Sequence, residues 1–469
     1  MGGGLMQLVA YGAQDIYLTG NPQITFFKVV YRRHTNFSME SIQQIFDGNA
    51  TYGNRASATI SRNGDLLYRL YLEHDAHITT TSGNHDIAAC CDYGNHVMKE
   101  CELQIGGQRI DKHYGHWNSV YSQLAGGFQH AGSRDNLFNR MSGNGMGHNN
   151  ITDVSGTHQG YQGWDHSDSD NFLKGKFWIP LHFWFCRNPG LALPLIALQY
   201  HEVKLIIQFE DIGQVAIQGQ DDNQGNSNSK SFIDANPAGF GPDETDFQLW
   251  ADYIYLDTDE RRRFAQVSHE YLIEQVQHQE VPCNGAMVLN FNHPVKKLIW
   301  SGTRALTPGT ASDPTRTNVN GQGQAHGRDT YQRRKIHNAH SDTYHLTLNG
   351  HERFAPRNYT YFTTTQIWQH HSGRDMEINR ISGNTKELDN LNTDTIAVYS
   401  FALKPEEHQP SGTCNFSRID NAQLIKSGSA VLEPVASGET QGIVNLNIYA
   451  VNYNVLRIMS GMGGLAYSN

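Results

Sequence analysis

The sequence predicts an all-β protein of two antiparallel β-sandwiches, with long loop insertions and a short helical linker. Three observations support this prediction: short segments of alternating polarity, a pattern that recurs after about half of the chain, and a composition rich in glycine and uncharged polar residues. Of 469 residues, 45 are glycine, 38% are hydrophobic and only 17% are charged. Such a composition suits short strands joined by polar loops better than long charged helices.

Alternating segments identify individual strands. Residues 100–105 and 203–209 place apolar side chains at every second position, which is typical of a strand with one buried face. Residues 55–61 alternate in the same way and are followed by Asn63-Gly64, the dipeptide that best fits a tight hairpin turn. We therefore expect a hairpin at that point.

Two further segments are apolar on both faces, at residues 177–181 and 396–401. Such segments are typical of strands buried inside a sandwich or against a neighbouring unit. The aromatic run at residues 177–185 could also form a stacking surface for sugar or nucleic acid. A buried strand is the preferred interpretation, because both faces are apolar.

An internal repeat indicates two copies of one sandwich. Residues 103–109 resemble residues 346–352: each is an alternating strand, a glycine-containing turn and a polar outgoing strand. Later in each half comes a buried strand, a turn rich in proline and glycine, and another strand, at residues 183–205 and 399–424. Two copies of one β-sandwich is the simplest interpretation.

The boundary between the copies is predicted at a charged segment. Residues 249–256 are expected to form a strand, and the segment after it begins a short helix that Thr258 could cap. The chain is thus divided into four parts: an N-terminal arm at 1–26, a first sandwich at 27–257, a linker helix at 258–270 and a second sandwich at 271–469.

Three stretches are low in apolar residues and are predicted to be long loops, at residues 126–171, 211–246 and 302–341. A buried loop would leave backbone groups without partners, so loops of this length are expected on the surface. A solvated insertion without chemistry is the preferred interpretation of each, and their individual roles stay open.

The residues do not suggest a catalytic, cofactor-binding or metal-binding site, and we predict none. Phosphate-binding, nucleophile-elbow and zinc-protease motifs are missing from the sequence. His74 and His77, like His113 and His116, have a spacing of three, which on a strand directs the two rings to opposite faces. The pair His370-His371 is expected to be a surface or loop feature.

The charge and the cysteine content of the chain limit the classes of function that it could have. The formal charge is −10, from 36 basic and 46 acidic residues, so direct binding to nucleic acid is not expected. The six cysteines are too few for a disulfide framework, and we expect reduced thiols. The first basic residue is Lys28, and no apolar run reaches the roughly 18 residues of a membrane span, so neither a secretory signal nor a transmembrane helix is expected.

Several long strings resemble one known family. The opening GLMQLVAYGAQDIYLTGNPQITFFK, at residues 4–28, and PSGTCNFSRIDNA, at residues 410–422, are similar to blocks of the major capsid proteins of nucleocytoplasmic large DNA viruses, especially those of chloroviruses and mimiviruses. Four more blocks resemble the same family, at residues 60–66, 105–114, 189–203 and 453–467. The resemblance spans nearly the whole chain, and the three long loops depart from it.

The resemblance implies a double jelly roll of two eight-stranded antiparallel sandwiches. It also implies a homotrimer that forms a pseudo-hexagonal capsomer, and an icosahedral outer shell of a virion tiled by such capsomers. Expected partners are neighbouring capsomers, minor capsid proteins and penton proteins, close to an internal membrane that the chain does not span. Synthesis in the host cytoplasm is expected. The alternative from another class is a jelly-roll protein that binds or cleaves carbohydrate.

Overall fold

The computed structural model describes most of both halves of the chain. The described residues are 34–80, 87–89, 93–125, 137–143, 164–167, 172–221, 230–233, 240–241, 246–304, 336–372, 395–432 and 443–467. The predicted N-terminal arm at residues 1–26 lies outside them.

The first sandwich packs two antiparallel sheets face to face. The larger one, called the β4 sheet, has the order β1 (Phe37–Gln44), β15 (Asp246–Leu256), β4 (Leu66–Thr80), β9 (Phe172–Pro180) and β8 (Trp164–Ser167), and the short strands β10 (Leu193–Pro194) and β14 (Phe240–Gly241) also pair with β4. The facing β6 sheet has the order β2 (Phe46–Asp47), β3 (Arg55–Thr59), β11 (Val203–Phe209), β6 (Met98–Ile105) and β7 (Gln108–Tyr114). A small separate sheet consists of β13 (Lys230–Ile233), β12 (Ala216–Asp221) and β5 (Ile87–Ala89).

The second sandwich repeats this arrangement. Its β18 sheet has the order β16 (His269–Pro282), β25 (Val444–Met459), β18 (Pro294–Arg304) and β22 (Ile396–Ser400), with β23 (Cys414–Asn415) on β18 and β26 (Met462–Leu465) on β25. The facing β19 sheet has the order β17 (Ala286–Leu289), β24 (Ala422–Lys426), β19 (Thr343–Leu348) and β20 (His351–Glu352), with β21 (Arg357–Asn358) on β19.

The two sandwiches share one topology. Going along each half, the first, third, sixth and eighth main strands form one sheet in the order β1-β15-β4-β9 or β16-β25-β18-β22. The other four form the second sheet in the order β3-β11-β6-β7 or β17-β24-β19-β20. Eight antiparallel strands in two facing sheets are the jelly-roll arrangement. The predicted all-β fold of two eight-stranded sandwiches is therefore confirmed.

Alternation of polarity builds each core. Along β11, every second residue from Val203 to Phe209 is buried, while the residues between them are half-buried. Each sandwich has its own cluster of buried apolar side chains between its sheets, and the first one includes Leu103, Phe177 and Leu249. Burying one such side chain contributes about 1.5–3 kcal/mol. The two clusters therefore stabilise the two sandwiches.

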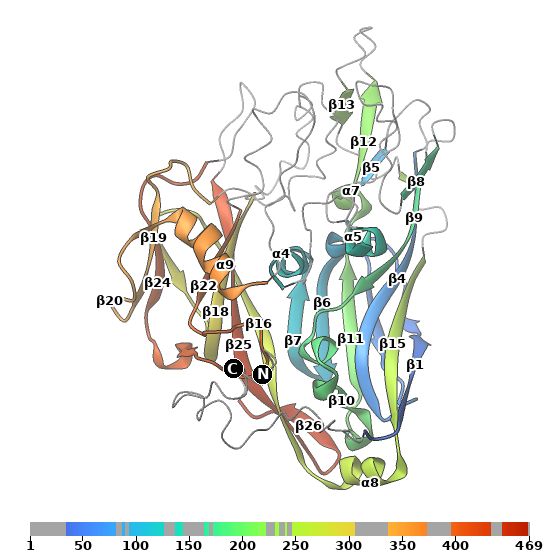
Figure 1. Cartoon of the computed structure of the whole chain (residues 1–469). Helices are drawn as coiled ribbons and strands as arrows, with labels where there is room; N and C mark the ends of the chain where they lie inside the picture. Colours follow the sequence, from blue (N-terminus) through green and yellow to red (C-terminus); the bar gives the residue numbers. More distant parts are fainter. Residues whose placement is uncertain are drawn as a thin grey trace, which may run out of the picture.

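Helical segments lie at the ends and flanks of the sandwiches (Figure 1). They are α3 (Tyr93–His96), α4 (Gly115–Ala125), α5 (Leu137–Ser142), α6 (Trp184–Arg187), α7 (Ile212–Val215), α8 (Thr258–Gln266), α9 (Gln366–His370), η1 (Pro189–Leu191), η2 (Leu195–Ala197), η4 (Tyr361–Thr365) and η5 (Phe416–Arg418). Among the described residues, none of these helices is long and apolar enough to cross a bilayer.

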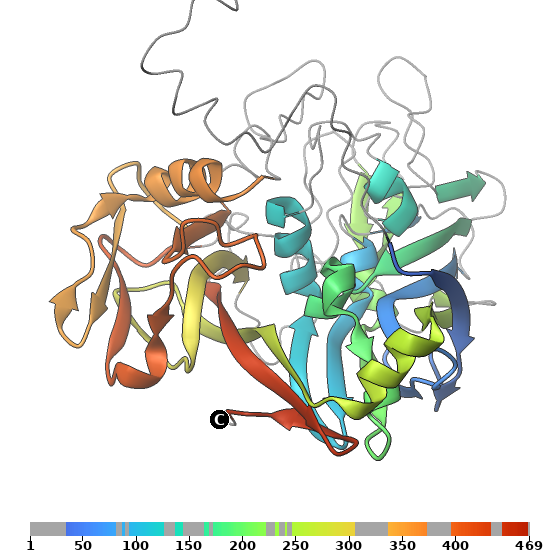
Figure 2. The same cartoon turned by 60° about the horizontal axis from the view of Figure 1, so that its bottom comes forward.

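Helix α8 connects the two sandwiches at one end of the molecule (Figure 2). Its N-terminal cap is Asp257, whose carboxylate accepts a hydrogen bond from the backbone of Thr258 at 2.7 Å. The expectation that Thr258 itself would cap the helix is wrong, because the aspartate one residue earlier takes that place.

Matching hairpins confirm the internal repeat at residues 103–109 and 346–352. β6 and β7 are joined by Gly106 and Gly107, and β19 and β20 are joined by Asn349 and Gly350. All four residues have positive φ angles, between 51° and 80°. Two consecutive positive φ angles define the turn type that matches the twist of antiparallel strands. The glycine-rich turns in the sequence therefore carry the same geometry in both halves.

The predicted hairpin at Asn63-Gly64 is wrong. The strand before it, β3, belongs to the β6 sheet, and the strand after it, β4, belongs to the β4 sheet, so the chain crosses between sheets there. Gly64 is required for another reason: a Cβ atom at this position would lie 2.6 Å from the Cβ of Tyr253. The glycine permits close packing instead of a tight turn.

Residues 177–181 are predicted to form a strand that is buried on both faces. Only one of the two faces is fully buried. Phe177 and Ile179 are buried, but Trp178 is 40% exposed on the outer face of the β4 sheet. The strand ends at Pro180, and the aromatic run continues into helix α6. Residues 396–398 of β22, in contrast, are buried on both faces, as predicted.

The stretches predicted as long loops contain some regular structure. Their described parts include α5 and β8 in residues 126–171, and α7, β12, β13 and β14 in residues 211–246. Helix α5 packs against β9. Its six residues are too short for a helical period to be visible in the sequence.

Candidate functional site at the junction of the two sandwiches

The two sandwiches lie side by side, and helix α4 of the first packs against the second (Figures 1 and 2). Trp117, Val120 and Leu124 form one face of this helix, and all three are at most 2% exposed. They contact outward-facing side chains of the β18 sheet, which are Ile299, Ile396, Val398, Tyr449 and Val451. The outer face of that sheet is thereby buried within one chain.

Polar contacts fix the position of α4. The Nδ1 atom of His116 lies 2.8 Å from the hydroxyl oxygen of Tyr449 on β25, and the two rings are stacked. The ring of Trp117 lies 5.1 Å from the ring of Tyr449. Because a buried hydrogen bond has directional requirements, it sets the register of the helix on the sheet.

The edge strands β7 and β16 form a second contact between the sandwiches. The carboxylate of Asp111 on β7 accepts a hydrogen bond from the backbone of Val276 on β16 at 3.1 Å. The Gln275 amide donates to the carbonyl of Ile110. The other carboxylate oxygen of Asp111 lies 2.9 Å from Nε2 of His113. Asp111 therefore contacts a side chain of its own sandwich and a backbone N–H of the other.

A group of charges lies beside this contact, with Glu274 and Lys296 buried and Arg187 partly exposed. Glu274 of β16 lies between Arg187 of α6, at 2.8 Å, and Lys296 of β18. Although burial raises the pKa of Glu274, the two cations outweigh it and lower this pKa to about 2. Arg187 belongs to the first sandwich and Glu274 to the second, so the ion pair joins them. Because the Glu274 partner is buried, this ion pair favours one relative position of the two sandwiches.

The C-terminal end of the chain makes a third contact. β16 and β25 extend beyond the second sandwich, so that Ile273, Leu456 and Ile458 are part of the core of the first. Near β26, the Nδ1 atom of His201 lies 2.9 Å from the carbonyl oxygen of Gly463. Together, the three contacts make the two sandwiches one unit.

The sequence alone did not identify these junction residues. Trp117, Val120 and Leu124 follow a helical spacing of three and four residues, which could have indicated a helix with one apolar face. The charged residues at positions 274 and 296 gave no signal, because their partners are distant in sequence. Only the fold brings them together.

The histidine pairs considered for metal binding lie in separate environments. His74 is buried and stacks on Phe247 with ring centres 4.0 Å apart, and burial lowers its pKa to about 3. His77 lies on the opposite face of the same strand. His113 and His116 contact Asp111 and Tyr449, respectively. Within the described ranges, no group of three or more potential metal ligands occurs.

Of the pair His370-His371, expected to be a surface or loop feature, His371 does lie in a loop, directly after helix α9, but it is not on the surface. Its side chain is fully buried, and Nδ1 lies 2.7 Å from a carboxylate oxygen of Glu406. Burial lowers the pKa of His371 to about 4. Helix α9 ends at His370, and the contact with Glu406 fixes the chain that follows it.

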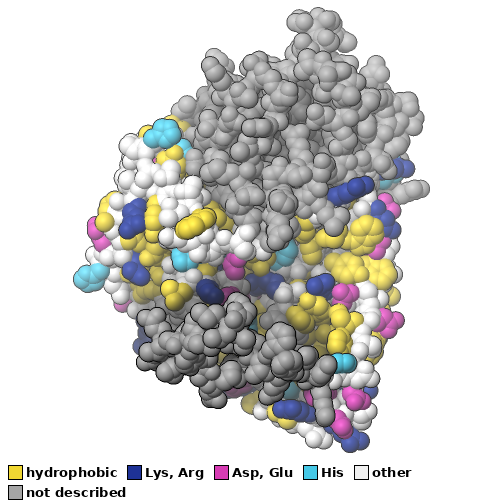
Figure 3. Space-filling view, in the orientation of Figure 1, with side chains coloured by type: hydrophobic (Ala, Val, Ile, Leu, Met, Phe, Trp, Pro, Cys, Tyr) yellow, Lys and Arg dark blue, Asp and Glu magenta, His cyan; other side chains and the backbone are white. Residues whose placement is uncertain are grey.

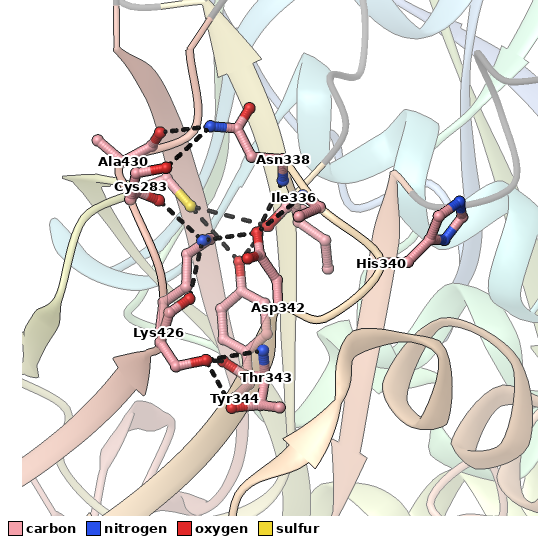
Figure 4. A network of polar contacts seen from close by, with 12 residues as sticks. Cys283, Ile336, Asn338, His340, Asp342, Thr343, Tyr344, Lys426 and Ala430 are labelled. Carbon is pink, nitrogen blue, oxygen red and sulfur yellow. Dashed lines mark hydrogen bonds and ion pairs between the residues drawn. The ribbon is translucent and has the colours of Figure 1, made fainter.

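One buried polar cluster contains residue types that could carry chemistry (Figure 4). Lys426 donates to the Asp342 carboxylate at 2.8 Å and to the carbonyls of Ser427 and Ser429. The Cys283 thiol lies 3.4 Å from the hydroxyl of Tyr344. Burial raises the pKa of Cys283 to about 11, which keeps the thiol protonated and unreactive near neutral pH.

This cluster has a structural role. Besides the bond from Lys426, the Asp342 carboxylate accepts a hydrogen bond from the backbone N–H of Asn338 at 2.8 Å. The hydroxyl of Tyr344 donates to the carbonyl of Ile336. Lys426 thus connects strand β24 to the segment that precedes β19. The cluster closes one end of the second sandwich.

Comparisons with known proteins agree with this architecture. A family model described as "Major capsid protein N-terminus" matches residues 25–257, and one described as "Large eukaryotic DNA virus major capsid protein" matches residues 260–464. The major capsid protein of Pyramimonas orientalis virus is 46% identical, and that of Paramecium bursaria Chlorella virus 1 is 42% identical. Capsid protein 1 of Acanthamoeba polyphaga mimivirus is 33% identical. Each of these three alignments covers 100% of both chains.

Solved structures show the same fold. A chain in the quasi-atomic structure of the PBCV-1 virus capsid is 35% identical, with a TM-score of 0.65, and the match covers 95% of this chain and 100% of that one. The Faustovirus major capsid protein is only 13% identical but has a TM-score of 0.63, with 96% and 94% of the two chains covered. The expected resemblance is confirmed, and the chain belongs to the major capsid proteins of large eukaryotic DNA viruses, a family of structural proteins of the virion capsid.

Proposed function

We propose that three copies of this chain form a pseudo-hexagonal capsomer and that such capsomers tile an icosahedral shell. The observation that carries this proposal is the shared topology of the two sandwiches, which lie side by side in one chain. Three copies present six similar sandwiches around a threefold axis, and these approximate a hexagon. The match to a chain of the PBCV-1 virus capsid supports an assembly of this kind.

The junction residues give the capsomer its rigid unit. Helix α4 joins the two sandwiches through buried contacts, and the Glu274 ion pair and β26 join them through partly buried ones. If the sandwiches moved independently, a ring of six would not close with one geometry. The junction is therefore expected to fix the angle between neighbouring sandwiches of the hexagon.

The proposed parts of the chain are an arm at 1–26, jelly rolls at 27–257 and 271–469, and a linker at 258–270. The position of α8 between the two sandwiches supports the linker. We assign the arm to the side of the capsomer that faces an internal membrane, where minor capsid proteins would contact it. Penton proteins and neighbouring capsomers are the other partners, and synthesis takes place in the host cytoplasm. The acidic balance of the chain supports a location away from the genome.

Native mass measurement of the purified full chain tests the proposal. A species of three times the chain mass of 52.7 kDa is expected at micromolar concentration. Obligate interfaces usually bury more than about 2,000 Å² in total, so the trimer should resist dilution. A stable monomer at neutral pH and ordinary salt would contradict the proposal. Specific binding or cleavage of glycans by that monomer would instead favour a carbohydrate-active protein.

A further inference from the structure

The junction of the two sandwiches contains a row of aromatic and histidine rings. In the first sandwich, His182 lies against Tyr121 of α4, and Tyr121 lies against Trp117, with ring centres 5.0 and 5.6 Å apart. Across the junction, Trp117 lies 5.1 Å from Tyr449 of β25, and Tyr449 lies 4.9 Å from His278 of β16. The row thus runs from one sandwich into the other, with a histidine at each end.

His278 lies directly between the sandwiches, with its ring centre 4.6 Å from that of Tyr114 on β7. Its Nε2 atom lies 2.6 Å from Oδ1 of Asn447, whose amide group donates to the hydroxyl of Thr303 at 2.7 Å. Because the Asn447 oxygen is an acceptor, Nε2 carries the proton of the neutral ring, and a second proton goes to Nδ1. Burial lowers the pKa of His278, although the bond to Asn447 opposes this effect.

His182 lies behind α4, on the side of the helix that faces its own sandwich. The residue is partly exposed, but its Nε2 atom is buried and has no hydrogen-bond partner among the described residues. Burial, together with His113 and Arg187, lowers the pKa of His182 to about 3. The ring is therefore neutral in the closed junction, and a proton on it would be repelled by the Arg187 guanidinium.

Titratable groups on several elements face these two rings. Around His278 they are Lys112 and Tyr114 of β7, Glu100 of β6, Glu280 of β16 and Tyr449 of β25. Around His182 they are Tyr121 of α4, His113 of β7 and Arg187 of α6, and Arg187 is paired with Glu274. The two glutamates near His278 favour its charged form and Lys112 opposes it, but burial outweighs the glutamates.

Two further histidines border the row but do not carry the inference. The Nε2 atom of His113 lies 2.9 Å from the Asp111 carboxylate, so a positive charge on that ring meets an anion. The Nδ1 atom of His116 lies 2.8 Å from the hydroxyl oxygen of Tyr449, which can accept a bond from a protonated ring. Acid therefore acts mainly on the two ends of the row.

Water borders this part of the junction. Basic and acidic side chains lie close together in the middle of the face that Figure 3 shows, between the two sandwiches. Charged groups of this kind remain hydrated at the surface. A proton from solution thus has a short path to the rings behind them.

The contact at β26 differs from the row of rings. The Nδ1 atom of His201 lies 2.9 Å from the carbonyl oxygen of Gly463, and a carbonyl accepts from a protonated ring as well as from a neutral one. Ile273, Leu456 and Ile458 also remain in the core of the first sandwich. The β26 end of the junction is therefore expected to tolerate acid.

We propose that the junction is an acid-sensitive hinge, in which protonation of His278 and His182 releases helix α4 from the β18 sheet while the β26 end holds the sandwiches together. The angle between the sandwiches is then fixed at neutral pH and relaxes in mild acid. A capsid built from such chains would loosen in an acidified compartment. This inference goes beyond the proposed capsomer and rests on contacts within one chain.

The pH range of the hinge follows from its histidines. When α4 is released, the rings return to water, where the ordinary pKa is 6.5. Because the pKa of His182 is lower in the closed junction than in the open one, the closed form is favoured above about pH 6.5 and loses this advantage as the pH falls through about 3. For His182 alone, the equilibrium constant for opening should rise about twentyfold between pH 7 and pH 5.

Other acid-sensitive groups act differently. His74 and His371 are also buried, but their partners Phe247 and Glu406 belong to the same sandwich as the histidine. Their protonation requires that sandwich to unfold, which exposes far more apolar surface than release of α4 does. Glu274, with its pKa near 2, responds only at lower pH.

Hydrogen exchange of the full chain at pH 7, 6 and 5 tests the hinge. Protection factors correct for the effect of pH on intrinsic exchange. The protection of residues 115–125 should fall at least tenfold between pH 7 and pH 5. Residues 203–209, in the core of the first sandwich, and residues 462–465 of β26 should keep their protection.

Three variants assign the effect to the histidines. The double variant His182→Gln with His278→Gln does not titrate and should keep α4 protected at pH 5. Asn447→Asp places a carboxylate beside His278, so its α4 protection should rise instead of fall between pH 7 and pH 5. His351→Gln is the control, because His351 is exposed on β20, and this variant should behave like the unmodified chain. Circular dichroism at pH 7 verifies that each variant is folded.

The outcomes decide the inference separately from the proposed function. Unchanged protection of α4 at pH 5, or an equal loss in the double variant, would show that these histidines are not the hinge. Equal losses in residues 115–125, 203–209 and 422–426 would mean that acid unfolds whole sandwiches. If the double variant does not fold, the unmodified chain and Asn447→Asp decide the question. The homotrimer is tested at pH 7, and none of these results bears on it.

Discussion

The Nδ1 atom of His116 and the hydroxyl of Tyr449 lie 2.8 Å apart, although 333 residues separate them in the chain. The first is on α4 of the first sandwich and the second on β25 of the other. Both side chains are buried. Removing the hydroxyl therefore tests the junction without changing the shape of the ring.

Tyr449→Phe is expected to lower the free energy of unfolding by about 1 kcal/mol, the usual net contribution of a buried hydrogen bond. Urea unfolding at one fixed protein concentration measures the change. Tyr467→Phe is the matched control, since Tyr467 is 64% exposed, and its midpoint should stay near that of the unmodified chain. Equal midpoints for both variants would show that the His116 contact does not stabilise the junction.

The hairpin between β6 and β7 offers a comparison of two adjacent glycines. Gly106 and Gly107 both have positive φ angles, 58° and 80°. A Cβ atom on Gly106 would lie 2.4 Å from Nδ1 of His201, whereas one on Gly107 would meet nothing within 4 Å. Alanine at either position carries the strain of a left-handed backbone, about 1–2 kcal/mol.

Gly106→Ala should therefore destabilise the chain more than Gly107→Ala, because it also displaces the His201 ring. That ring lies 2.9 Å from the carbonyl of Gly463, so the damage should extend to the β26 contact. Thermal unfolding of both variants measures the difference, and hydrogen exchange of residues 462–465 locates it. If both variants lose the same stability, the close approach of His201 has no energetic role.

Glu274 should make the stability of the junction depend on acid. Arg187 and Lys296 hold its pKa near 2 against the opposing effect of burial, compared with an ordinary value of 4.5. Because the pKa is lower in the folded chain, the carboxylate stabilises the fold above about pH 4.5. This contribution, on the order of 3 kcal/mol, is lost as the pH falls from about 4.5 through about 2.

Glu274→Gln should reduce the stability at neutral pH, because it leaves the buried ammonium group of Lys296 and the partly exposed Arg187 without their anion. It should also flatten the decrease in stability between pH 4.5 and pH 2. Urea midpoints across that range measure both effects. Glu270→Gln on the same strand is the control, because its pair with Arg457 is about half exposed and should matter little. An unchanged acid slope in Glu274→Gln would mean that this carboxylate does not titrate in the way proposed.

Local patterns were sufficient to predict the strands and the repeated hairpins. Within eight residues the sequence shows both the alternating apolar positions of a strand, at Leu103 and Ile105, and the two glycines of the hairpin turn after it. The equivalent residues around Asn349 show the same two features. Such signals depend only on neighbouring positions, which is why they are visible in the sequence. The sandwich fold followed from many signals of this kind.

Long-range packing explains what could not be predicted. The dipeptide Asn63-Gly64 signals a turn, but the sheet that the next strand joins depends on Tyr253, almost 200 residues later. Similarly, β9 and β22 both appear apolar on two faces, yet only β22 is covered by α4. Whether the outer face of a strand is buried therefore depends on which helix the fold places against it.

The buried pair of Lys426 and Asp342 gives the last prediction. Both side chains are nearly inaccessible, at 0% and 5% exposed, and the ammonium group also donates to two backbone carbonyls. The bond from Lys426 lowers the pKa of Asp342 in spite of its burial. Because the carboxylate would remain buried without its cation, Lys426→Met should destabilise the second sandwich by about 3–5 kcal/mol.

The exposed pair of Lys404 and Glu407 provides the matched control. The Nζ atom of Lys404 and a carboxylate oxygen of Glu407 lie 2.8 Å apart, the same distance as in the buried pair. The two side chains, however, are 68% and 57% exposed. Lys404→Met should therefore change the stability by less than about 1 kcal/mol. Urea unfolding followed by tryptophan fluorescence compares the variants, since Trp300 lies in the same core as Tyr344. If the two lysine variants were equally stable, burial would not be what gives the Lys426 pair its importance, and closure of this end of the sandwich would rest on the backbone bonds to Asp342 alone.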